Sequence, residues 1–393
     1  MSGLMPTYRR YPLRLVRGEG LRVFDDAGRA YLDFAAGIAA VPLGHGHPRW
    51  LEAVHAQLDR LVHVSNLYAT GPQEELAERL RELAGFGLVF LSNSGAESNE
   101  AALKIVRRYG RPRGRLQVVA LDGSFHGRTF ATLAATGQPD KRAPFEPLGG
   151  ATFVPPNDLD ALDEAVDETT AAILVEPVLG EGGIVPLEPR YLEAARRLSD
   201  ERGALLVFDE VQTGVGRCGS WFAFQRSGVR PDVFTLAKGL ANGLPIGATV
   251  AAETLAFGPG EHASTFGGGP VPCAGALAVL GAIEEEGLLE NARVQGERLA
   301  AGLDRALEDA GLPGRTRGLG LLLGAPVGTG EGPPKAGTVV RALMARGFLA
   351  TEAGGDVVRC TPPLTVDGAT VDSFVDAFDE ALAASLQPAE ASA

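Results

Sequence analysis

The chain has 393 residues, of which 45% are hydrophobic and 22% charged, a composition typical of a globular protein with about two domains. Its net charge of −13 argues against nucleic acid as a general partner. No apolar run reaches the ~18 residues that a membrane span needs, and the N-terminus lacks an apolar signal-peptide core. Three scattered cysteines have neither metal-site spacing nor a pairing framework, so we expect a cytoplasmic protein that binds no metal.

The predicted elements begin with two short strand-like pieces at residues 21–24 and 31–34. We expect this N-terminal segment, residues 1–45, to pack against the C-terminal part of the chain. Further along, short apolar runs recur without alternating polar residues. They occupy residues 88–91, 116–120, 152–154, 171–175, 204–208, 233–236 and 248–252. Such runs are typical of a mostly parallel sheet that helices cover on both faces.

Helical patterns lie between several of these runs, at residues 97–108, 159–166 and 189–202. The sequence therefore predicts an α/β domain with a seven-stranded sheet over residues 46–258. The pattern then changes to helices at residues 272–286 and 291–310, with short strands near 319–324 and 357–360. This change predicts a smaller α+β domain over residues 259–393.

Polar residues follow several of the predicted strands. They are Ser92-Asn93-Ser94-Gly95-Ala96, Asp122-Gly123-Ser124-Phe125-His126, Glu176-Pro177, Asp209-Glu210-Val211-Gln212 and Ala237-Lys238. Ligands of open α/β sheets bind beyond the carboxyl ends of the strands. We therefore expect the functional site to contain these residues.

Only four of the 36 basic residues are lysines, and Lys238 alone ends an apolar run. The other three, Lys104, Lys141 and Lys335, have ordinary polar surroundings. Burial lowers the pKa of an amine, so that its neutral form can attack a carbonyl. Such an attack usually forms a Schiff base. A lysine that buries only its stem is the alternative for Lys238.

Asp209 also stands at the end of an apolar run, where a buried carboxylate needs a cation or a donor. A protonated pyridine nitrogen would supply one, and a buried ion pair is the alternative. Gln212 could donate to an oxygen on the same ring. Ser94-Gly95-Ala96 opens a predicted helix, so its N–H groups could bind a phosphate. A plain serine N-cap with Glu97 explains the same residues.

Taken together, these motifs resemble the class III aminotransferases, which are pyridoxal 5'-phosphate enzymes of fold type I. The resemblance spans nearly the whole chain and rests on residues 93–102, 125–129, 176–177, 180–183, 209–214, 237–238 and 264–268, in the family order. It implies that Lys238 forms the Schiff base with the cofactor and that Asp209 pairs with the pyridine nitrogen. Lys238 would then also carry the proton between the substrate carbon and the cofactor.

The same resemblance assigns the other cofactor contacts. Gln212 would contact the ring hydroxyl, Phe125 would stack on the ring, and Ser94, Gly95 and Ala96 would hold the phosphate. Thr265 would reach the phosphate of a neighbouring subunit, which implies a homodimer with shared active sites. A core aromatic is the alternative for Phe125, and a turn beside glycines is the alternative for Thr265.

Two arginines in family blocks, Arg128 and Arg359, can hold carboxylates bidentately. The resemblance assigns Arg359 to the α-carboxylate of glutamate, and Glu181 to pairing with Arg359 while an ω-amine reacts. Around residues 37–48 the chain resembles acetylornithine aminotransferases. There, an apolar Ile38 would suit an acylated amine better than a charged one, although simple packing also explains it.

The sequence thus predicts transfer of the ω-amino group of N2-acetylornithine to 2-oxoglutarate, which gives N-acetylglutamate 5-semialdehyde and glutamate. Similar enzymes often also accept succinyldiaminopimelate. The enzymatic alternatives are a 4-aminobutyrate or ornithine transaminase, a lysine-pathway transaminase with a carrier-linked substrate, and an aminomutase. The non-enzymatic alternative is a regulator that binds the cofactor without turnover.

Overall fold

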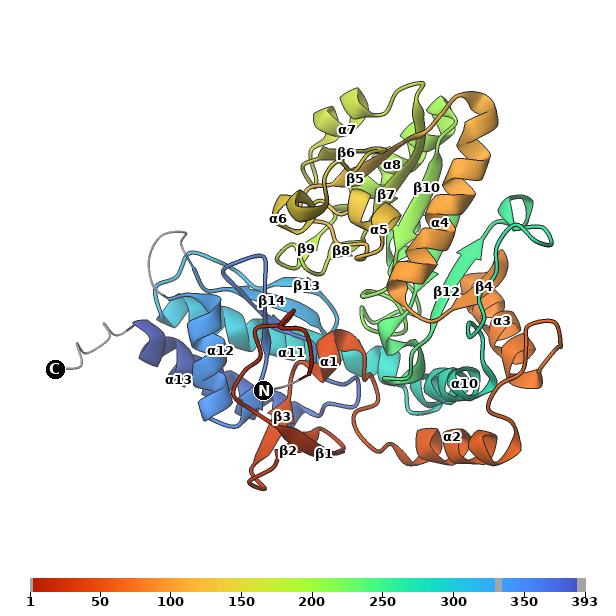
Figure 1. Cartoon of the computed structure of the whole chain (residues 1–393). Helices are drawn as coiled ribbons and strands as arrows, with labels where there is room; N and C mark the ends of the chain where they lie inside the picture. The colour runs from red at the N-terminus through yellow and green to blue at the C-terminus, as the bar shows by residue number, and fades with distance from the viewer. Residues whose placement is uncertain (1–2, 329–333, 387–393) are drawn as a thin grey trace.

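The computed structural model describes residues 3–328 and 334–386 of the chain. A seven-stranded sheet with the order β4-β12-β11-β10-β7-β5-β6 forms the centre of the larger part (Figure 1). Its strands are β4 (Leu88–Ser92), β5 (Gln117–Leu121), β6 (Ala151–Val154), β7 (Thr170–Val175), β10 (Leu205–Asp209), β11 (Val233–Leu236) and β12 (Gly247–Ala251). All seven predicted strands are therefore present, close to their predicted positions.

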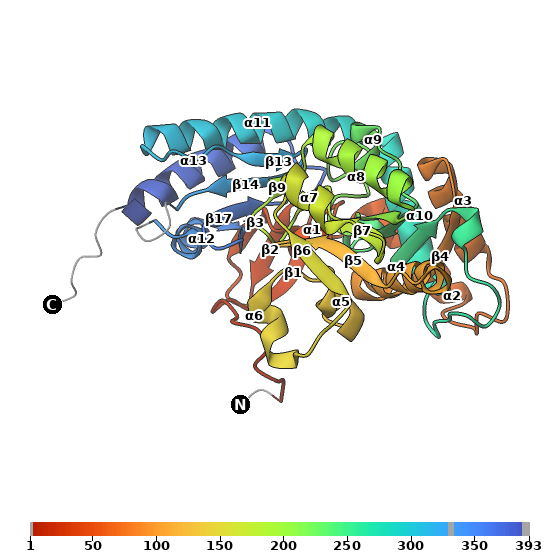
Figure 2. The ribbon, with the colours of Figure 1, turned by 90° about the horizontal axis from the view of Figure 1, so that it is seen from above.

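The sheet is mostly parallel, as predicted. The β6-β5, β5-β7, β7-β10 and β10-β11 pairs are parallel, whereas β12 runs antiparallel to both β11 and β4. The strands read as continuous apolar runs because both faces of the sheet are covered. Leu174 of β7 packs in the same hydrophobic cluster as Ile105 of α4 (Gly95–Gly110). Its neighbour Ile173 points to the other face and packs with Leu192 of α8 (Pro189–Arg202) (Figure 2).

Further elements complete this part of the chain. They are α1 (Ala36–Ala39), α2 (Pro48–Arg60), α3 (Gly71–Ala84), α5 (Phe130–Ala134), α6 (Pro139–Arg142), α7 (Leu159–Ala165), β8 (Val178–Leu179), β9 (Val185–Pro186), α9 (Phe224–Ser227) and α10 (Pro270–Glu285). Four 3-10 helices, η1 to η4, occupy Arg111–Arg113, Ala143–Phe145, Lys238–Ala241 and Glu253–Leu255. Helix α10 packs against both α2 and α3.

The C-terminal part contains a second, four-stranded sheet of order β13-β14-β17-β16, which is antiparallel throughout. Its elements are α11 (Leu288–Asp309), β13 (Arg317–Leu319), β14 (Leu322–Pro326), α12 (Ala336–Ala345), β16 (Thr351–Ala353), β17 (Val357–Cys360) and α13 (Gly368–Leu386). The single strand expected near residues 319–324 is wrong, because β13 and β14 form a hairpin there. Gly320 makes the turn with a φ of +55°, and a side chain on it would collide with the carbonyl oxygen of Arg217.

The N-terminal strands β1 (Leu15–Glu19), β2 (Arg22–Asp25) and β3 (Ala30–Asp33) form a small antiparallel sheet. Strand β3 also pairs in parallel with β15 (Phe348–Leu349), so the two ends of the chain share a sheet (Figure 1). Stacked rings of Phe34 and Phe374, with centroids 3.9 Å apart, join them further. The domain limits at residues 45 and 258 stay a prediction.

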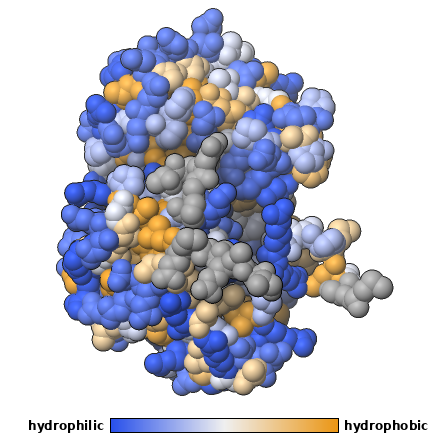
Figure 3. Space-filling model, turned by 90° about the vertical axis from the view of Figure 1, so that its left-hand side faces the viewer, coloured by the Kyte–Doolittle hydropathy of each residue, from blue (hydrophilic) through white to orange (hydrophobic). Residues whose placement is uncertain are grey.

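The face that the C-terminal part presents is largely hydrophilic, with hydrophobic side chains in small groups (Figure 3). Within residues 3–328 and 334–386, we find no helix with both the length and the apolar character that crossing a bilayer requires.

Candidate active site

The carboxyl ends of β4, β5, β7, β10 and β11 surround a cavity of about 390 Å³. Most of the predicted site residues line it, namely Ser94, Gly95, Ala96, Phe125, Arg128, Asp209, Gln212 and Lys238. These residues come from elements far apart in the sequence. They meet because parallel strands end at one edge of the sheet.

Lys238 lies one residue beyond the buried strand β11, after Ala237, and begins η3. Burial lowers the pKa of its amine, and the negative charge of Glu181 acts in the opposite direction. The amine has no hydrogen bond to any residue within the described ranges. The backbone of Lys238 adopts a φ of +39°, a conformation that is uncommon for non-glycine residues. The fold therefore presents this amine to the cavity as a potential nucleophile or base.

Asp209, at the end of β10, is 3% exposed and accepts several hydrogen bonds. Its Oδ2 accepts from Asn99 Nδ2 and from His126 Nδ1, each at 2.7 Å, and its Oδ1 accepts from the backbone N–H of Val211 at 3.0 Å. Burial alone would lower the pKa of His126, but the hydrogen bond and charge of Asp209 outweigh it, so the pKa is raised. These donors fix a carboxylate at the wall of the cavity.

The N-terminus of α4 forms another wall. Ser94 Oγ accepts the N–H of Glu97 at 3.2 Å, so the N-cap interpretation is confirmed. The N–H groups of Gly95 and Ala96 meet no acceptor among the described residues, although both residues line the cavity. A side chain on Gly95 would lie 2.9 Å from Val211, which explains the glycine. The serine cap therefore leaves the N–H groups of Gly95 and Ala96 available to bind an anion.

Phe125 and Arg128 lie on the loop that follows β5. The backbone N–H of Phe125 donates to Glu176 Oε1 at 2.8 Å, and Oε2 of the same carboxyl accepts from Gly180 at 3.1 Å. Burial raises the pKa of Glu176 to about 7. The buried Glu176 thus connects the loop that carries Phe125 to the loop after β7.

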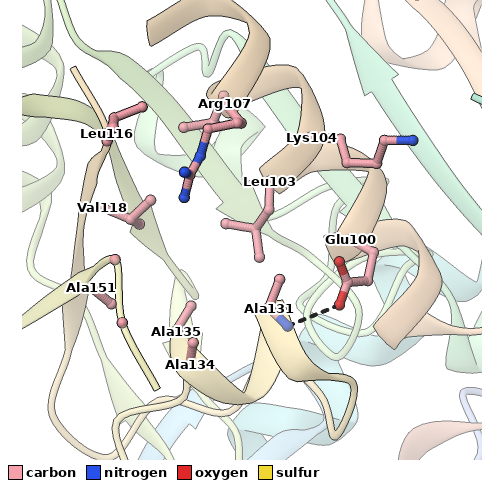
Figure 4. A pocket seen from close by; sticks show the side chains of 13 residues that line it. Glu100, Leu103, Lys104, Arg107, Leu116, Val118, Ala131, Ala134, Ala135 and Ala151 are labelled. Carbon is pink, nitrogen blue, oxygen red and sulfur yellow. Dashed lines mark hydrogen bonds between the residues drawn. The ribbon is translucent and has the colours of Figure 1, made fainter. Parts of the chain in front are cut away.

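Helix α4 holds the other end of this loop. Helix α5 starts just after Arg128, and Glu100 of α4 accepts from the N–H of Ala131 at 3.1 Å (Figure 4). A separate cavity of about 190 Å³ between these helices has a largely apolar lining, and none of the predicted site residues lines it. The loop that carries Arg128 is therefore anchored at both ends.

Arg359 of β17 is 1% exposed and forms an ion pair with Glu181. Its guanidinium also donates to the carbonyl of Gly180 at 3.0 Å and to Thr351 Oγ1 at 3.0 Å, and it lies 3.4 Å from Gln212 Oε1. Burial would raise the pKa of Glu181, but the charge of Arg359 outweighs it, so this pKa is lowered. A charged pair therefore stands beside the cavity, within electrostatic reach of Lys238.

Four predicted site residues lie outside the lining of this cavity: Glu181 and Arg359, which stand beside it, and Ile38 and Thr265. Ile38 is half-buried in the kinked helix α1 with a φ of +62°, and Ala40 lines the cavity instead. Thr265 is exposed on the loop before α10, beside Tyr68. Helix α1 does pack against η3, the helix that Lys238 begins, so Ile38 lies near the site without lining the cavity.

Several buried polar residues support the predicted ones; the sequence placed His126 and Glu176 at the site without a specific role, and it did not single out Asn99 or Thr235. Asn99 and His126 hold Asp209, and Glu176 holds the backbone of Phe125. Thr235 Oγ1 in turn donates to Asn99 Oδ1 at 2.7 Å. The available signal was a polar residue inside an apolar segment, as with Thr235 in β11.

Comparisons with known proteins agree with this geometry. Residues 5–382 match the family described as Aminotransferase class-III. The chain is 47% identical to an acetylornithine aminotransferase of Thermosynechococcus vestitus, with 97% of this chain and 95% of that protein covered. It is 50% identical to an acetylornithine aminotransferase of Streptomyces coelicolor, with 95% of this chain and 92% of that protein covered.

Solved structures are similar over almost the whole chain. The N-acetylornithine aminotransferase of Stenotrophomonas maltophilia is 36% identical with a TM-score of 0.84, covering 96% of this chain and 97% of that one. The ornithine aminotransferase of Toxoplasma gondii is 31% identical with a TM-score of 0.91, covering 97% of this chain and 93% of that one.

Proposed function

Because the chain belongs to the class-III aminotransferases and is a pyridoxal 5'-phosphate-dependent enzyme, we propose that it transfers the ω-amino group of N2-acetylornithine to 2-oxoglutarate. The products are N-acetylglutamate 5-semialdehyde and glutamate. The ion pair between the buried Arg359 and the half-buried Glu181, beside Lys238, carries the proposal, because it provides for two kinds of substrate. The identity of 44–50% to acetylornithine aminotransferases supports the choice of donor.

The residues around the cavity fit the cofactor. The N–H groups of Gly95 and Ala96 have no acceptor in the described part of the chain and lie at the positive end of a helix of 16 residues, which suits a phosphate. The carboxylate of Asp209 suits the protonated pyridine nitrogen. The bound cofactor supplies an electron sink for the bond broken at the substrate carbon. The ring of Phe125 offers a stacking surface, and Gln212 an amide for the ring hydroxyl.

The chain's own residues handle the proton. The lowered pKa of Lys238 favours a neutral Nζ, which can take the proton from the substrate carbon that bears the amine. The same Nζ then returns the proton, so it serves as base and acid in turn. The donors around Asp209 keep its carboxylate in place during both transfers.

The pair of Arg359 and Glu181 allows one site to bind two different substrates. When the ω-amine reacts, the donor has no carboxylate near Arg359, and Glu181 neutralises that guanidinium. When 2-oxoglutarate binds, its carboxylate replaces Glu181 on Arg359. Arg128 takes the carboxylate at the far end of the substrate, and Ile38 provides an apolar surface for the acyl group.

We also propose a homodimer with shared active sites. Thr265 is exposed on the loop before α10, and nearby side chains are apolar and open to solvent: Leu67 is 87%, Tyr68 70% and Phe266 66% exposed. A second copy that covers this surface would bring its Thr265 to the phosphate site. Three unpaired, buried cysteines agree with a cytoplasmic enzyme.

Ornithine is the second candidate donor, because the structural likeness to the ornithine aminotransferase of Toxoplasma gondii is high. A panel of ω-amines with 2-oxoglutarate tests the choice. We expect the highest kcat/KM with N2-acetylornithine, and a lower value with succinyldiaminopimelate, ornithine or 4-aminobutyrate. A higher kcat/KM with ornithine or 4-aminobutyrate would overturn the proposed donor.

A further inference from the structure

Lys141 has a position that its polar sequence context did not predict. It lies in the short helix α6, and its Nζ is 4.9 Å from the centroid of the Phe125 ring. The guanidinium carbon of Arg128 is 5.6 Å from the same centroid. Both cations therefore lie over one ring, and that ring and Arg128 belong to the lining of the cavity.

The amine of Lys141 is held in this position. It donates to Gln138 Oε1, and Gln138 Nε2 donates to the carbonyl oxygens of Gly123 at 3.1 Å and Ser124 at 3.4 Å. These residues belong to the loop that leads into Phe125. The amine is therefore fixed relative to Phe125 before any substrate arrives, which reduces the entropy lost on binding.

Neither cation has an anionic partner among the described residues. Within the part of the chain that the structure describes, Arg128 makes no hydrogen bond or ion pair, and Lys141 donates only to the neutral amide of Gln138. The nearest carboxylates are already engaged, because Glu181 pairs with Arg359 and Glu176 accepts two backbone N–H groups. A carboxylate that enters between Arg128 and Lys141 would therefore find two free donors.

The charges around Lys141 also favour the binding of an anion beside it. Burial lowers the pKa of Lys141, and the charges of Arg128 and Arg359 lower it further, while Glu181 and Glu176 act in the opposite direction. A bound carboxylate would favour the ammonium form of the same amine. The electrostatics thus favour a substrate that places a negative charge between Lys141 and Arg128.

We propose that Lys141 and Arg128 together bind the carboxylate that lies at the end of the donor opposite to the reacting amine, and that Lys141 thereby selects donors that carry this group. The inference deepens the proposed function and rests on it. When the ω-amine of N2-acetylornithine lies at Lys238, its α-carboxylate is at the far end of the molecule. Arg359 cannot take that group while it is paired with Glu181.

Two matched donors test this selection. N-acetylputrescine is N2-acetylornithine without its carboxylate, so the ratio of kcat/KM between them measures what the carboxylate contributes. We expect Lys141→Gln to lower kcat/KM about ten-fold for N2-acetylornithine, as expected for one charge-assisted hydrogen bond, and to leave N-acetylputrescine unchanged. Lys141→Arg should restore most of the loss. Lys335→Gln, at an exposed lysine before α12, is the matched control and should alter neither value.

Binding without turnover gives a second measurement. N2-acetylnorvaline keeps the carboxylate and acyl group of the donor but lacks the amine, so its Kd for the holoenzyme can be measured by calorimetry. We expect Lys141→Gln to raise this Kd about ten-fold and Lys141→Arg to raise it little. Equal losses with both donors, or unchanged values in Lys141→Gln, would overturn the role of Lys141.

The failure of the proposed function is a separate result. If the wild-type enzyme prefers another ω-amino acid, that donor and its decarboxylated counterpart replace the acetylated pair. The effect of Lys141→Gln on their ratio then decides the inference in the same way.

Discussion

Arg359 and Glu181 form an ion pair at the edge of the cavity, although they come from β17 and from the loop after β8. Arg359 is almost fully buried, so its positive charge would be costly without this partner. Glu181 also acts electrostatically on Lys238, which connects the pair to the reacting amine. Whether Arg359 is paired with Glu181 or with a substrate carboxylate can therefore determine which of the two half-reactions the site favours.

Glu181→Gln should impair the donor half-reaction selectively. Without the carboxylate, Arg359 stays charged beside a donor that offers it no anion, and we expect kcat/KM for N2-acetylornithine to fall about ten-fold. The half-reaction with glutamate should change little, because its α-carboxylate replaces Glu181. Stopped-flow absorbance of the cofactor measures both half-reactions. Equal losses in both would contradict the exchange.

Lys238→Ala should abolish turnover and the absorbance of the covalently bound cofactor. Borohydride reduction of the wild-type enzyme, followed by peptide mapping, should label Lys238. Lys335→Ala, at an exposed lysine before α12, is the control and should keep both the turnover and the absorbance. A label on another lysine would show that the covalent role is misassigned.

Asp209→Asn should lower kcat by roughly 100-fold or more, as for removal of one preorganised electrostatic contact at a reacting group. An amide cannot hold the pyridine nitrogen in its protonated form as a carboxylate does. Asn99 and His126 would still donate to the remaining carbonyl oxygen, so the fold should persist. Steady-state kinetics and circular dichroism of the holoenzyme separate the two effects. A variant with near-normal kcat would rule out this role.

Glu210 makes stability depend on pH. Burial raises its pKa from 4.5 to about 7, although the N–H groups of Ala223 and Phe224 each donate to it at 2.8 Å. Because the folded-state pKa is raised, its stabilising contribution is present below about pH 4.5 and is lost as pH rises through about 7. The whole loss is roughly 3 kcal/mol at about 1.4 kcal/mol per pKa unit.

Glu210→Gln removes this titration. From about pH 5 to about pH 8, the free energy of unfolding of the variant should therefore fall less than that of the wild type. Urea unfolding at both pH values measures the difference. Glu193→Gln, on the exposed face of α8, should follow the wild type. Parallel curves for wild type and Glu210→Gln would exclude a raised pKa.

The sequence predicted the sheet well because strands covered on both faces must be apolar along their whole length, as β7 and β10 are. It predicted β13 and β14 as one strand, because the turn at Gly320 lies within a short apolar run. Nearly all predicted cofactor contacts line one cavity, since each follows a strand at the same edge of the sheet. Thr265 is the exception, and its proposed role needs a second chain.

Contacts between distant segments were beyond prediction. The bonds of Asn99 and His126 to Asp209 depend on how α4 and the loop after β5 pack, which no local pattern records. Lys141 appeared ordinary for the same reason, because its polar neighbours in sequence do not reveal the nearby ring of Phe125. Long-range packing, rather than local propensity, determines these partners.

Shared active sites make a prediction about mixtures of inactive chains. Lys238→Ala lacks the reacting amine, and Thr265→Glu should repel the phosphate of the neighbouring site, so each homodimer should have little activity. In a mixed dimer, one site combines Lys238 from the Thr265→Glu chain with Thr265 from the Lys238→Ala chain. Random mixing should therefore restore about a quarter of wild-type activity, because half of the dimers contain one intact site.

The mixture must be unfolded and refolded together so that chains exchange, and light scattering should give the mass of a dimer or larger assembly. Leu67→Glu places a charge in the exposed apolar surface and should shift the enzyme toward monomers with little activity. The exposed residue Glu193 again provides the control, as Glu193→Lys adds a charge change outside that surface. No recovery of activity in mixed dimers of normal mass would mean that each chain builds its site alone.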